Sequence, residues 1–268
     1  MMNFSRAWKI SVFGLLLTVW QQTAFSWGPL GHRAICDATW RLSPPTLRQQ
    51  LGTAAERMGY DTFAESCVWA DDVRGQTSYQ WLAPLHYVNV PASATRASEA
   101  ECWSQPRHSE PTCVLQAIDF FTQRLGDSRL FQRQRDEALL LLGHFVGDVH
   151  QPLHVSYAED RGGTRTQVIF KGERLSLHRF WDTTILYCET HEHWRQLGRR
   201  LYQQARKQRG ETGQPLAWAD ESLALTRSIY GRQHRHIDDD YCHQYSPLVQ
   251  ERLVLAALRL QKLIAARL

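Results

Sequence analysis

The stretch 144-HFVGDVHQPLH-154 constrains the fold of this chain more than any other. It follows an apolar run and predicts a buried helix, on which His144 and Asp148, four residues apart, lie on one face. Pro152 disfavours helical backbone in the residue before it, so the helix should end there and His154 can approach from another direction. Two imidazoles and a carboxylate so placed are typical of part of a metal site. A capped core helix with incidental histidines would show the same spacing, so both interpretations stay open at this point.

The first 26 residues have the pattern of a secretory signal peptide. A positively charged start precedes an apolar core at residues 10–20, and 24-AFS-26 fits a small-x-small cleavage site. The apolar core is too short to span a bilayer comfortably. Cleavage would make Trp27 the first residue and leave 27–268, which is enough for one large domain. The protein is therefore expected to be secreted or periplasmic after cleavage before Trp27, with no membrane span.

Charge and cysteine content narrow the class of protein further. The net charge of +4 is compatible with a polyanionic substrate, although no long block of Lys and Arg demands one. An even number of cysteines in an exported chain favours disulfides over thiolate metal ligands, and no CxxC pair argues otherwise. Spacing alone leaves the pairing of the six cysteines open.

Apolar spacing and turn residues predict an all-α fold: one mainly helical domain with a small β-hairpin. Helices are expected at 27–42, 43–51, 61–73, 112–125, 129–149, 178–187, 191–208, 215–230 and 247–267. Residues 81–110 are rich in proline and small polar residues and are expected to form a long loop. The hairpin is expected at residues 166–170 and 174–177.

A single helix cannot surround a metal ion, so partners must come from elsewhere in the chain. The stretch 178-HRFWD-182 again places a histidine and a carboxylate four residues apart. Asp71 in WAD, His86 in HYVN and His32 in WGPLGH are further candidates. Each pair alone could be a surface or helix-capping pair, but two pairs flanked by core-type aromatics favour ligands. A mixed set of His and Asp without cysteine suits zinc.

Six motifs in order, WGxxGH, WAD, HYVN, HFxGDxHQPLH, DRGG and LHxxWD, run from Trp27 to Asp182. This set closely resembles the zinc-dependent single-strand-specific nucleases and 3'-nucleotidases, the mung bean nuclease type and its bacterial relatives. The resemblance implies a helical fold shared with zinc-dependent phospholipase C, and three zinc ions. The implied ligands are Asp71, His86, His144 and Asp148 for one ion, His154, His178 and Asp182 for a second, and His32, the bridging Asp148, and the amine and carbonyl of Trp27 for a third. The third site would be complete only after the leader is removed.

The resemblance also implies the chemistry. It predicts hydrolysis of single-stranded DNA and RNA to 5'-phosphate products, with 3'-nucleotidase activity, by metal-activated hydroxide. Zinc ions about 3.5–4 Å apart can lower the pKa of a bridging water and hold phosphate oxygens, so no side-chain nucleophile is required. Asp71 and Asp148 would serve catalysis as ligands, and Arg74 matches a basic position that adds a donor to the developing charge. Tyr87 and Asn89 match positions that grip a nucleobase, and stacking needs the exposed base of a single strand.

The resemblance also bears on the disulfide pairing and shows two departures from the family pattern. The resemblance suggests a disulfide between Cys36 and Cys67, and Cys102 with Cys113 is the next expectation because it would pin the proline-rich loop. Cys188 and Cys242 then remain. The family often has asparagine after DRGG, where this chain has Thr164, and Ser176 is a second departure. Both put substrate positioning in doubt more than zinc binding.

The other histidines and two rival functions have weaker support in the sequence. His150 matches no zinc position and is expected to be structural, and Asp220, in a second WAD tripeptide, is expected at the start of a helix. The remaining histidines, His108, His191, His193, His234, His236 and His243, are expected to have no role in the site. A zinc-dependent phospholipase C typically has glutamate where this chain has Asp182, and a longer gap after its N-terminal tryptophan. An exported zinc-binding protein without catalysis would not need Arg74. The protein is expected to be a monomer.

Overall fold

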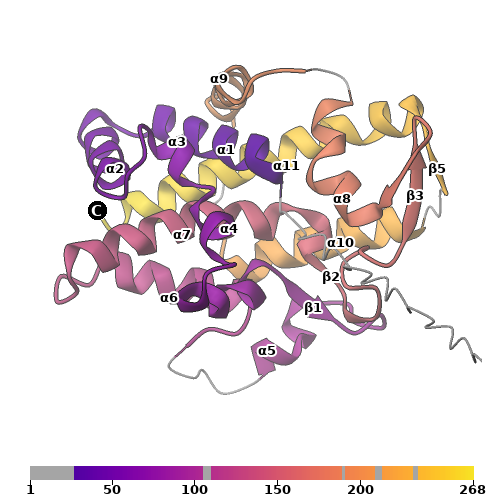
Figure 1. The fold of residues 1–268 in the computed structure, drawn as a ribbon, viewed down its shortest axis with the longest axis horizontal. Helices are drawn as coiled ribbons and strands as arrows, with labels where there is room; N and C mark the ends of the chain where they lie inside the picture. Colours follow the sequence, from indigo (N-terminus) through magenta and orange to yellow (C-terminus); the bar gives the residue numbers. More distant parts are fainter. Residues whose placement is uncertain (1–26, 105–109, 189–190, 209–212, 232–234) are drawn as a thin grey trace, which may run out of the picture.

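Helices make up most of the fold, with two small sheets beside them (Figure 1). The computed structural model describes residues 27–104, 110–188, 191–208, 213–231 and 235–268. The α-helices are α1 (Gly28–Leu42), α2 (Pro45–Arg57), α3 (Phe63–Ser66), α4 (Trp69–Val73), α5 (Glu101–Ser104), α6 (Val114–Leu125), α7 (Gln132–His150), α8 (Leu177–Asp182), α9 (Trp194–Ala205), α10 (Pro215–Gly231) and α11 (Asp239–Ala265). The strands are β1 (Val88–Val90), β2 (Val155–Tyr157), β3 (Gln167–Phe170), β4 (Glu173–Ser176) and β5 (His236–Ile237). The expected mainly helical fold is confirmed.

Helix α7 crosses the middle of the molecule, between α6 and α11 (Figure 1). Every side chain from Ala138 to His150 is buried, which explains why the sequence of this segment has no solvent-facing polar stripe and why its polar residues are the candidate ligands and His150. The helix ends as expected, because Gln151 has extended backbone before the proline. A short 3-10 helix, η3 (Pro152–His154), follows and leads into β2.

Two glycines let α1 approach α7 closely. A Cβ atom at Gly143 would lie 2.5 Å from the sulfur of Cys67, and one at Gly147 would lie 2.9 Å from the ring of His32. Real Cβ atoms do not make such contacts, so larger residues here would push α1 away from α7. Gly143 and Gly147 therefore allow His32 to lie against the face of α7 that carries His144.

The proline-rich segment is more ordered than expected. Instead of one long loop, the described part of 81–110 contains most of a 3-10 helix, η1 (Thr77–His86), then β1, a second 3-10 helix (Ala97–Glu99) and α5. Strand β1 pairs in parallel with β2, with Val88 opposite Val155. This pairing joins residues far apart in sequence, and local patterns do not reveal it. It places the end of η1 beside the end of η3.

Several helix boundaries also differ from expectation. The helix expected at 43–51 is α2, and it continues to Arg57. The helix expected at 61–73 is divided into α3 and α4. The last helix begins at Asp239, because the side chain of Asp238 accepts a hydrogen bond from the backbone N–H of Tyr241 and caps it. Pro247 lies inside this helix rather than at its start.

The small hairpin is present as expected. Strands β3 and β4 are antiparallel, with Gln167 opposite Ser176, and β5 pairs in parallel with β3. Both turn residues, Lys171 and Gly172, have positive φ angles of 48° and 84°, as a two-residue hairpin turn requires. The hairpin leads directly into α8, which carries the second histidine and carboxylate pair.

Three disulfides join distant parts of the chain. They link Cys36 with Cys67, Cys102 with Cys113, and Cys188 with Cys242. Among the residues that the structure describes, no helix combines the length and the apolar character needed to cross a bilayer. The expected leader at 1–26 lies outside the described residues.

Candidate metal centre

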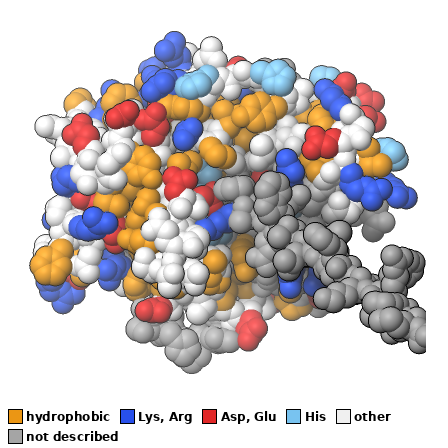
Figure 2. All heavy atoms as spheres, in the orientation of Figure 1, with side chains coloured by type: hydrophobic (Ala, Val, Ile, Leu, Met, Phe, Trp, Pro, Cys, Tyr) orange, Lys and Arg blue, Asp and Glu red, His pale blue; other side chains and the backbone are white. Residues whose placement is uncertain are grey.

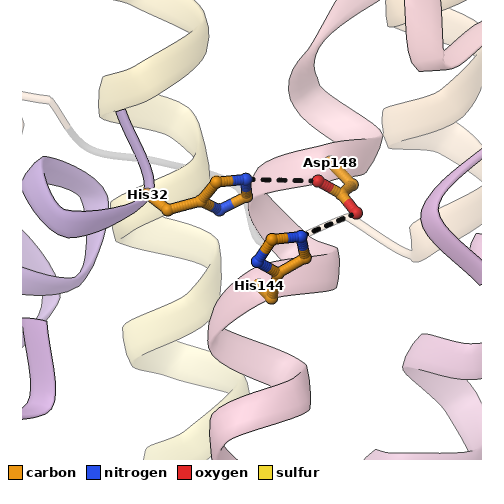
Figure 3. A group of neighbouring side chains, drawn as sticks. All are labelled: His32, His144 and Asp148. Atoms are coloured by element: carbon orange, nitrogen blue, oxygen red, sulfur yellow. Dashed lines mark ion pairs between the residues drawn. The ribbon is translucent and has the colours of Figure 1, made fainter. Parts of the chain in front are cut away.

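Helix α7 and helix α1 form the first group of candidate ligands (Figure 3). The Nε2 atom of His32 lies 3.4 Å from Oδ1 of Asp148, and Nε2 of His144 lies 3.5 Å from Oδ2 of the same carboxylate. All three residues are fully buried, and the two imidazole rings stack with their centroids 3.8 Å apart. The two oxygens of Asp148 therefore face two different histidines.

A second group lies on the other side of His144. His86, the last residue of η1, places Nδ1 at 3.1 Å from Oδ2 of Asp148 and 3.1 Å from Nε2 of His144. The Oδ1 atom of Asp71, on α4, is 3.9 Å from both of those ring nitrogens. Arg74 places Nη1 at 3.3 Å from the same oxygen of Asp71. Asp148 thus contributes to both groups, and a guanidinium borders the second.

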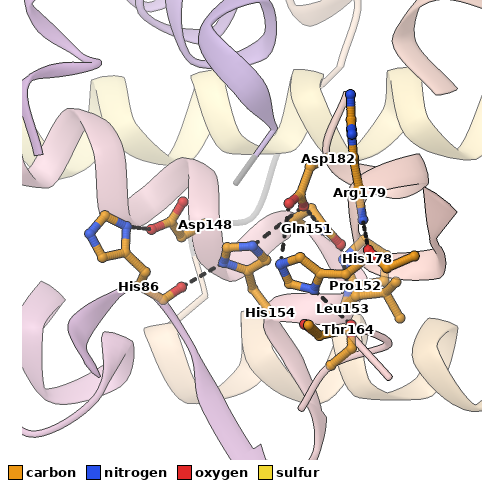
Figure 4. Close-up of polar contacts among 12 residues, drawn as sticks. His86, Asp148, Gln151, Pro152, Leu153, His154, Thr164, His178, Arg179 and Asp182 are labelled. Carbon is orange, nitrogen blue, oxygen red and sulfur yellow. Dashed lines mark hydrogen bonds and ion pairs between the residues drawn. The ribbon is translucent and has the colours of Figure 1, made fainter. Parts of the chain in front are cut away.

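The third group is formed by η3 and α8 (Figure 4). Asp182 lies between two histidines, with Oδ1 at 3.5 Å from Nε2 of His154 and Oδ2 at 3.2 Å from Nε2 of His178. Gln151 donates a hydrogen bond from Nε2 to Oδ1 of Asp182, and its Oε1 accepts one from the backbone N–H of Leu153. Sequence reasoning missed Gln151, although its place between two candidate ligands was a usable signal.

Backbone carbonyls orient three of the four histidines whose Nε2 atoms face carboxylates. Nδ1 of His144 lies 2.9 Å from Cys67 O, Nδ1 of His154 lies 2.6 Å from His86 O, and Nδ1 of His178 lies 2.7 Å from Gly162 O. A carbonyl only accepts, so each Nδ1 carries a proton, and Nε2 keeps its lone pair whenever the ring is neutral. This is the tautomer that an imidazole needs in order to bind a metal through Nε2.

The turn before the hairpin wraps around His178. Gly162 and Gly163 have φ angles of +64° and +87°, and the backbone N–H of His178 donates to Gly163 O. A Cβ atom at Gly162 would lie 2.5 Å from Leu153 O, so the close approach requires glycine there. The DRGG motif therefore holds both the backbone and the ring of His178.

Many of the buried polar atoms in these groups have no hydrogen-bond partner in the part of the chain that the structure describes. They include Nε2 of His32, His154 and His178, Oδ1 of Asp71, both carboxylate oxygens of Asp148, and Oδ2 of Asp182. Leaving such atoms unsatisfied in the interior costs about 1–3 kcal/mol each. Bound cations would satisfy them together. In each of the three groups the possible ligand atoms lie within 4.8 Å of one another, so the residues fit metal ions.

The electrostatics of the groups agree with this interpretation. Burial alone would raise the pKa of Asp148, but His144, His32 and His86 hold it well below its usual value, so the carboxylate is ionised. Burial lowers the pKa of His144 well below its usual value and keeps that ring neutral. Burial also disfavours the charged form of His154, yet the nearby carboxylates of Asp182 and Asp148 raise its pKa to about 9. His154 must therefore lose a proton when a metal binds.

Trp27 lies beside the site. Its side chain is fully buried and its carbonyl oxygen accepts a hydrogen bond from the backbone N–H of Gly31. A Cβ atom at Gly28 would lie 3.3 Å from Asp182 O, so the start of α1 packs against the third group. The ligand role implied for the amine and carbonyl of Trp27 stays a prediction.

The two candidate base-binding residues follow His86 directly. Tyr87 is 41% exposed, and Asn89 is half-buried on β1. The two departures from the family pattern have local roles instead. The hydroxyl of Thr164 donates to Arg161 O at 2.8 Å, and Oγ of Ser176 accepts from the backbone N–H of Arg179 and caps α8.

The residues set aside by sequence are found in different surroundings. His191, His193, His236 and His243 are exposed, while His108 and His234 lie outside the described residues. Asp220 does not start a helix as expected: it lies inside α10 and accepts a hydrogen bond from the backbone N–H of Ala97. His150 is fully buried and belongs to a polar network at the end of α7.

Lys and Arg side chains are distributed over the visible face of the molecule among acidic and uncharged ones (Figure 2). A simple basic patch therefore does not identify a partner on that face.

Comparisons with known proteins give one family. The S1/P1 nuclease family matches residues 27–268. Endonuclease 2 of Arabidopsis thaliana is 32% identical over 186 residues, covering 66% of this chain and 63% of that protein. Endonuclease 5 of the same plant is 27% identical over 281 residues, covering 95% of this chain and 94% of that protein. Nuclease P1 of Penicillium citrinum is 33% identical over 162 residues, covering 59% of this chain and 57% of that protein. The matched region thus spans less than two thirds of Endonuclease 2 and of Nuclease P1.

Proposed function

Because this chain belongs to the S1/P1 nuclease family and is therefore a nuclease, we propose that it is a zinc-dependent endonuclease acting on single-stranded DNA and RNA. In this proposal it leaves 5'-phosphate products and also removes 3'-phosphates from nucleotides. The observation that supports it best is the carboxylate of Asp148, whose two oxygens face His32 on one side and His86 and His144 on the other. One buried carboxylate shared in this way suits two neighbouring cations.

Zinc is the proposed metal, with three ions per chain. The donors are imidazole nitrogens and carboxylate oxygens without thiolates, because all six cysteines are in disulfides. When bound, such ions supply Lewis acidity that polarises a phosphate and acidifies water. The third ion in this proposal uses the backbone of Trp27 together with His32 and Asp148.

The protein's own groups bind and orient the substrate. Arg74 borders Asp71, where its guanidinium can donate hydrogen bonds to a phosphate oxygen as negative charge develops. The exposed ring of Tyr87 offers a stacking face one residue from His86, and Asn89 offers an amide for a base edge. A paired base does not expose its face, so this grip selects single strands.

Export is proposed from two observations. Three disulfides indicate an oxidising compartment, and the family match begins at Trp27, directly after the proposed leader. Cleavage before Trp27 would release its amine for the third ion. The active protein is proposed to be a monomer.

The test combines metal analysis with three substrates. The purified, processed protein should hold three zinc ions and should cleave single-stranded DNA and RNA but not phosphatidylcholine. Fewer than two tightly bound zinc ions would refute the proposal. Cleavage of phosphatidylcholine without cleavage of nucleic acid would replace it with a phospholipase C-like activity.

A further inference from the structure

A partly buried ionic cluster lies at the end of α7, outside the groups of candidate ligands. It consists of Glu221 and Ser222 from α10 and Arg252 and Arg259 from α11, and is called the α7 clamp below. The carboxylate of Glu221 accepts one hydrogen bond from Arg252 and two from Arg259, each of 2.7 Å. Both arginines are buried, at 3% and 7% exposure, whereas the carboxylate side is partly open to solvent.

The α7 clamp binds the last turn of α7 through its backbone. Ser222 donates from Oγ to Val149 O at 2.6 Å, and Arg252 donates from Nε to His150 O at 3.2 Å. These carbonyls are among those that a helix end leaves without partners. Two guanidinium groups at a helix C-terminus also face the negative end of the helix dipole.

The side chain of His150 completes the attachment. Its Nδ1 donates to Val146 O at 2.7 Å, which leaves Nε2 to accept a hydrogen bond from Arg259 at 2.9 Å. The ring also lies against Trp218, with centroids 5.5 Å apart. The structural role expected for His150 is thus a specific one: it connects α11 to the helix that carries Asp148.

The residues that the α7 clamp holds lie between ligands of different groups. Val149 and His150 follow Asp148 directly, and the next residue, Gln151, donates to Asp182 in the third group. The path from Asp148 to His154 therefore passes through the clamped turn. A small rotation there would move Asp148 away from His32 or Gln151 away from Asp182.

We propose that the α7 clamp is a positioning device for the metal centre, which sets the angle at which Asp148 and His154 face their partner ligands. The inference rests on the proposed function only in requiring that the centre binds zinc. Stability alone explains the clamp poorly, because burying two arginines costs solvation free energy, and ion pairs with a carboxylate that is partly open to solvent return little of it. A helix can also end with a simple glycine cap.

The test is a comparison of two variants of the same helix. Glu221→Gln keeps the size of the side chain but removes the charge that holds both arginines together. Asp136→Asn is the matched control, because buried Asp136 near the start of α7 accepts two 2.6 Å hydrogen bonds from Arg57. It lies twelve residues before Asp148, about 18 Å along the helix. Zinc affinity, measured by competition with a chromogenic chelator, and the melting temperature of the zinc-free protein are compared for both.

We expect both variants to melt at lower temperature, and only Glu221→Gln to bind zinc more weakly, by about 10–100-fold, as for other groups that orient ligands. Unchanged zinc affinity in Glu221→Gln, or an equal loss in Asp136→Asn, would overturn the inference. If Glu221→Gln does not fold, Ser222→Ala removes the hydrogen bond that the hydroxyl donates to Val149 O and the one that it accepts from Arg252, and leaves the ion pairs of Glu221 in place. This variant should weaken zinc binding in the same direction; unchanged affinity there would likewise overturn the inference. A wild-type protein that binds zinc but cleaves no nucleic acid would refute the proposed function without affecting this comparison.

Discussion

The carbonyl oxygen of His86 lies 2.6 Å from Nδ1 of His154, so the backbone of one candidate ligand orients the ring of another. This hydrogen bond exists because β1 and β2 pair in parallel just beyond the two histidines, with Val88 opposite Val155. It connects the group around Asp71 with the group around Asp182. The groups of candidate ligands are therefore parts of one centre rather than separate sites.

Asp148 should be the most sensitive ligand. Asp148→Asn is expected to reduce kcat/KM on single-stranded DNA by at least about tenfold more than Asp182→Asn, because losses of 10–100-fold accompany even the outer partners of ligands and Asp148 serves two groups. The two substitutions make the same chemical change. Zinc content, measured beside activity, should fall further in Asp148→Asn. Equal losses in the two variants would contradict a shared carboxylate.

Gly162 should be required for the orientation of His178. Gly162→Ala would strain a positive φ of 64° and also bring Cβ to 2.5 Å from Leu153 O, whereas Gly172→Ala at φ 84° meets nothing within 4 Å. Both variants should lose about 1–2 kcal/mol in unfolding free energy from backbone strain. Only Gly162→Ala should also lose zinc.

The comparison is read from chemical denaturation curves and metal analysis of both variants. A normal zinc content in Gly162→Ala would show that the DRGG turn does not hold His178 in place.

The metal-free protein should lose stability as pH rises from about 6.5 to 9. Asp182 holds the pKa of His154 at about 9 despite burial, above the usual 6.5, so the stabilising proton is fully present below 6.5 and lost through 9. The shift corresponds to a loss on the order of 3 kcal/mol. The pKa values of His144 and His178 are lowered by burial, so both rings are already neutral in this window.

Denaturation in the presence of a chelator at several pH values measures this effect, with His154→Gln as the comparison. The variant should show a much smaller decline between pH 6.5 and 9. A decline of the same size in the variant would assign the effect to other groups.

Local sequence patterns predicted most of the fold but little of how its parts meet. The spacing of His144 and Asp148 predicted that both lie on one face of a helix, and Pro152 predicted where this helix ends. The structure confirms both. The boundary at Pro247 was wrong because the Asp238 cap and the buried face of α11 outweigh the preference of proline for a first turn. Local propensity decides a boundary only where tertiary packing leaves it free.

For the candidate site, the spacing rules alone left ligands and incidental histidines undecided, and the ordered motifs supplied the full set. What no pattern supplied was the support around the ligands. This support comes from residues far apart in the sequence. Gln151 binds Asp182, the carbonyl of Cys67 binds His144, and Arg252 of the α7 clamp binds the carbonyl of His150. Such contacts leave no periodicity in the sequence, because they depend on how elements pack rather than on how each one forms.

Tyr87 should provide the stacking face for a base. Tyr87→Ala is expected to weaken binding of a short single-stranded oligonucleotide by about 1–3 kcal/mol, the value of one base stacked on an aromatic ring.

Tyr187→Ala is the matched control, because Tyr187 is 38% exposed, close to the 41% of Tyr87, but lies in a different segment, Thr184–Tyr187. Fluorescence anisotropy with a cleavage-resistant phosphorothioate oligonucleotide would measure binding with the metal centre intact, and zinc content should not differ between the two tyrosine variants. Because Tyr87 is expected to contact the base and not the metal, hydrolysis of a substrate without a base, such as bis(p-nitrophenyl) phosphate, should be much less affected. Weaker binding in Tyr187→Ala, or unchanged binding in Tyr87→Ala, would move the base-binding site away from His86.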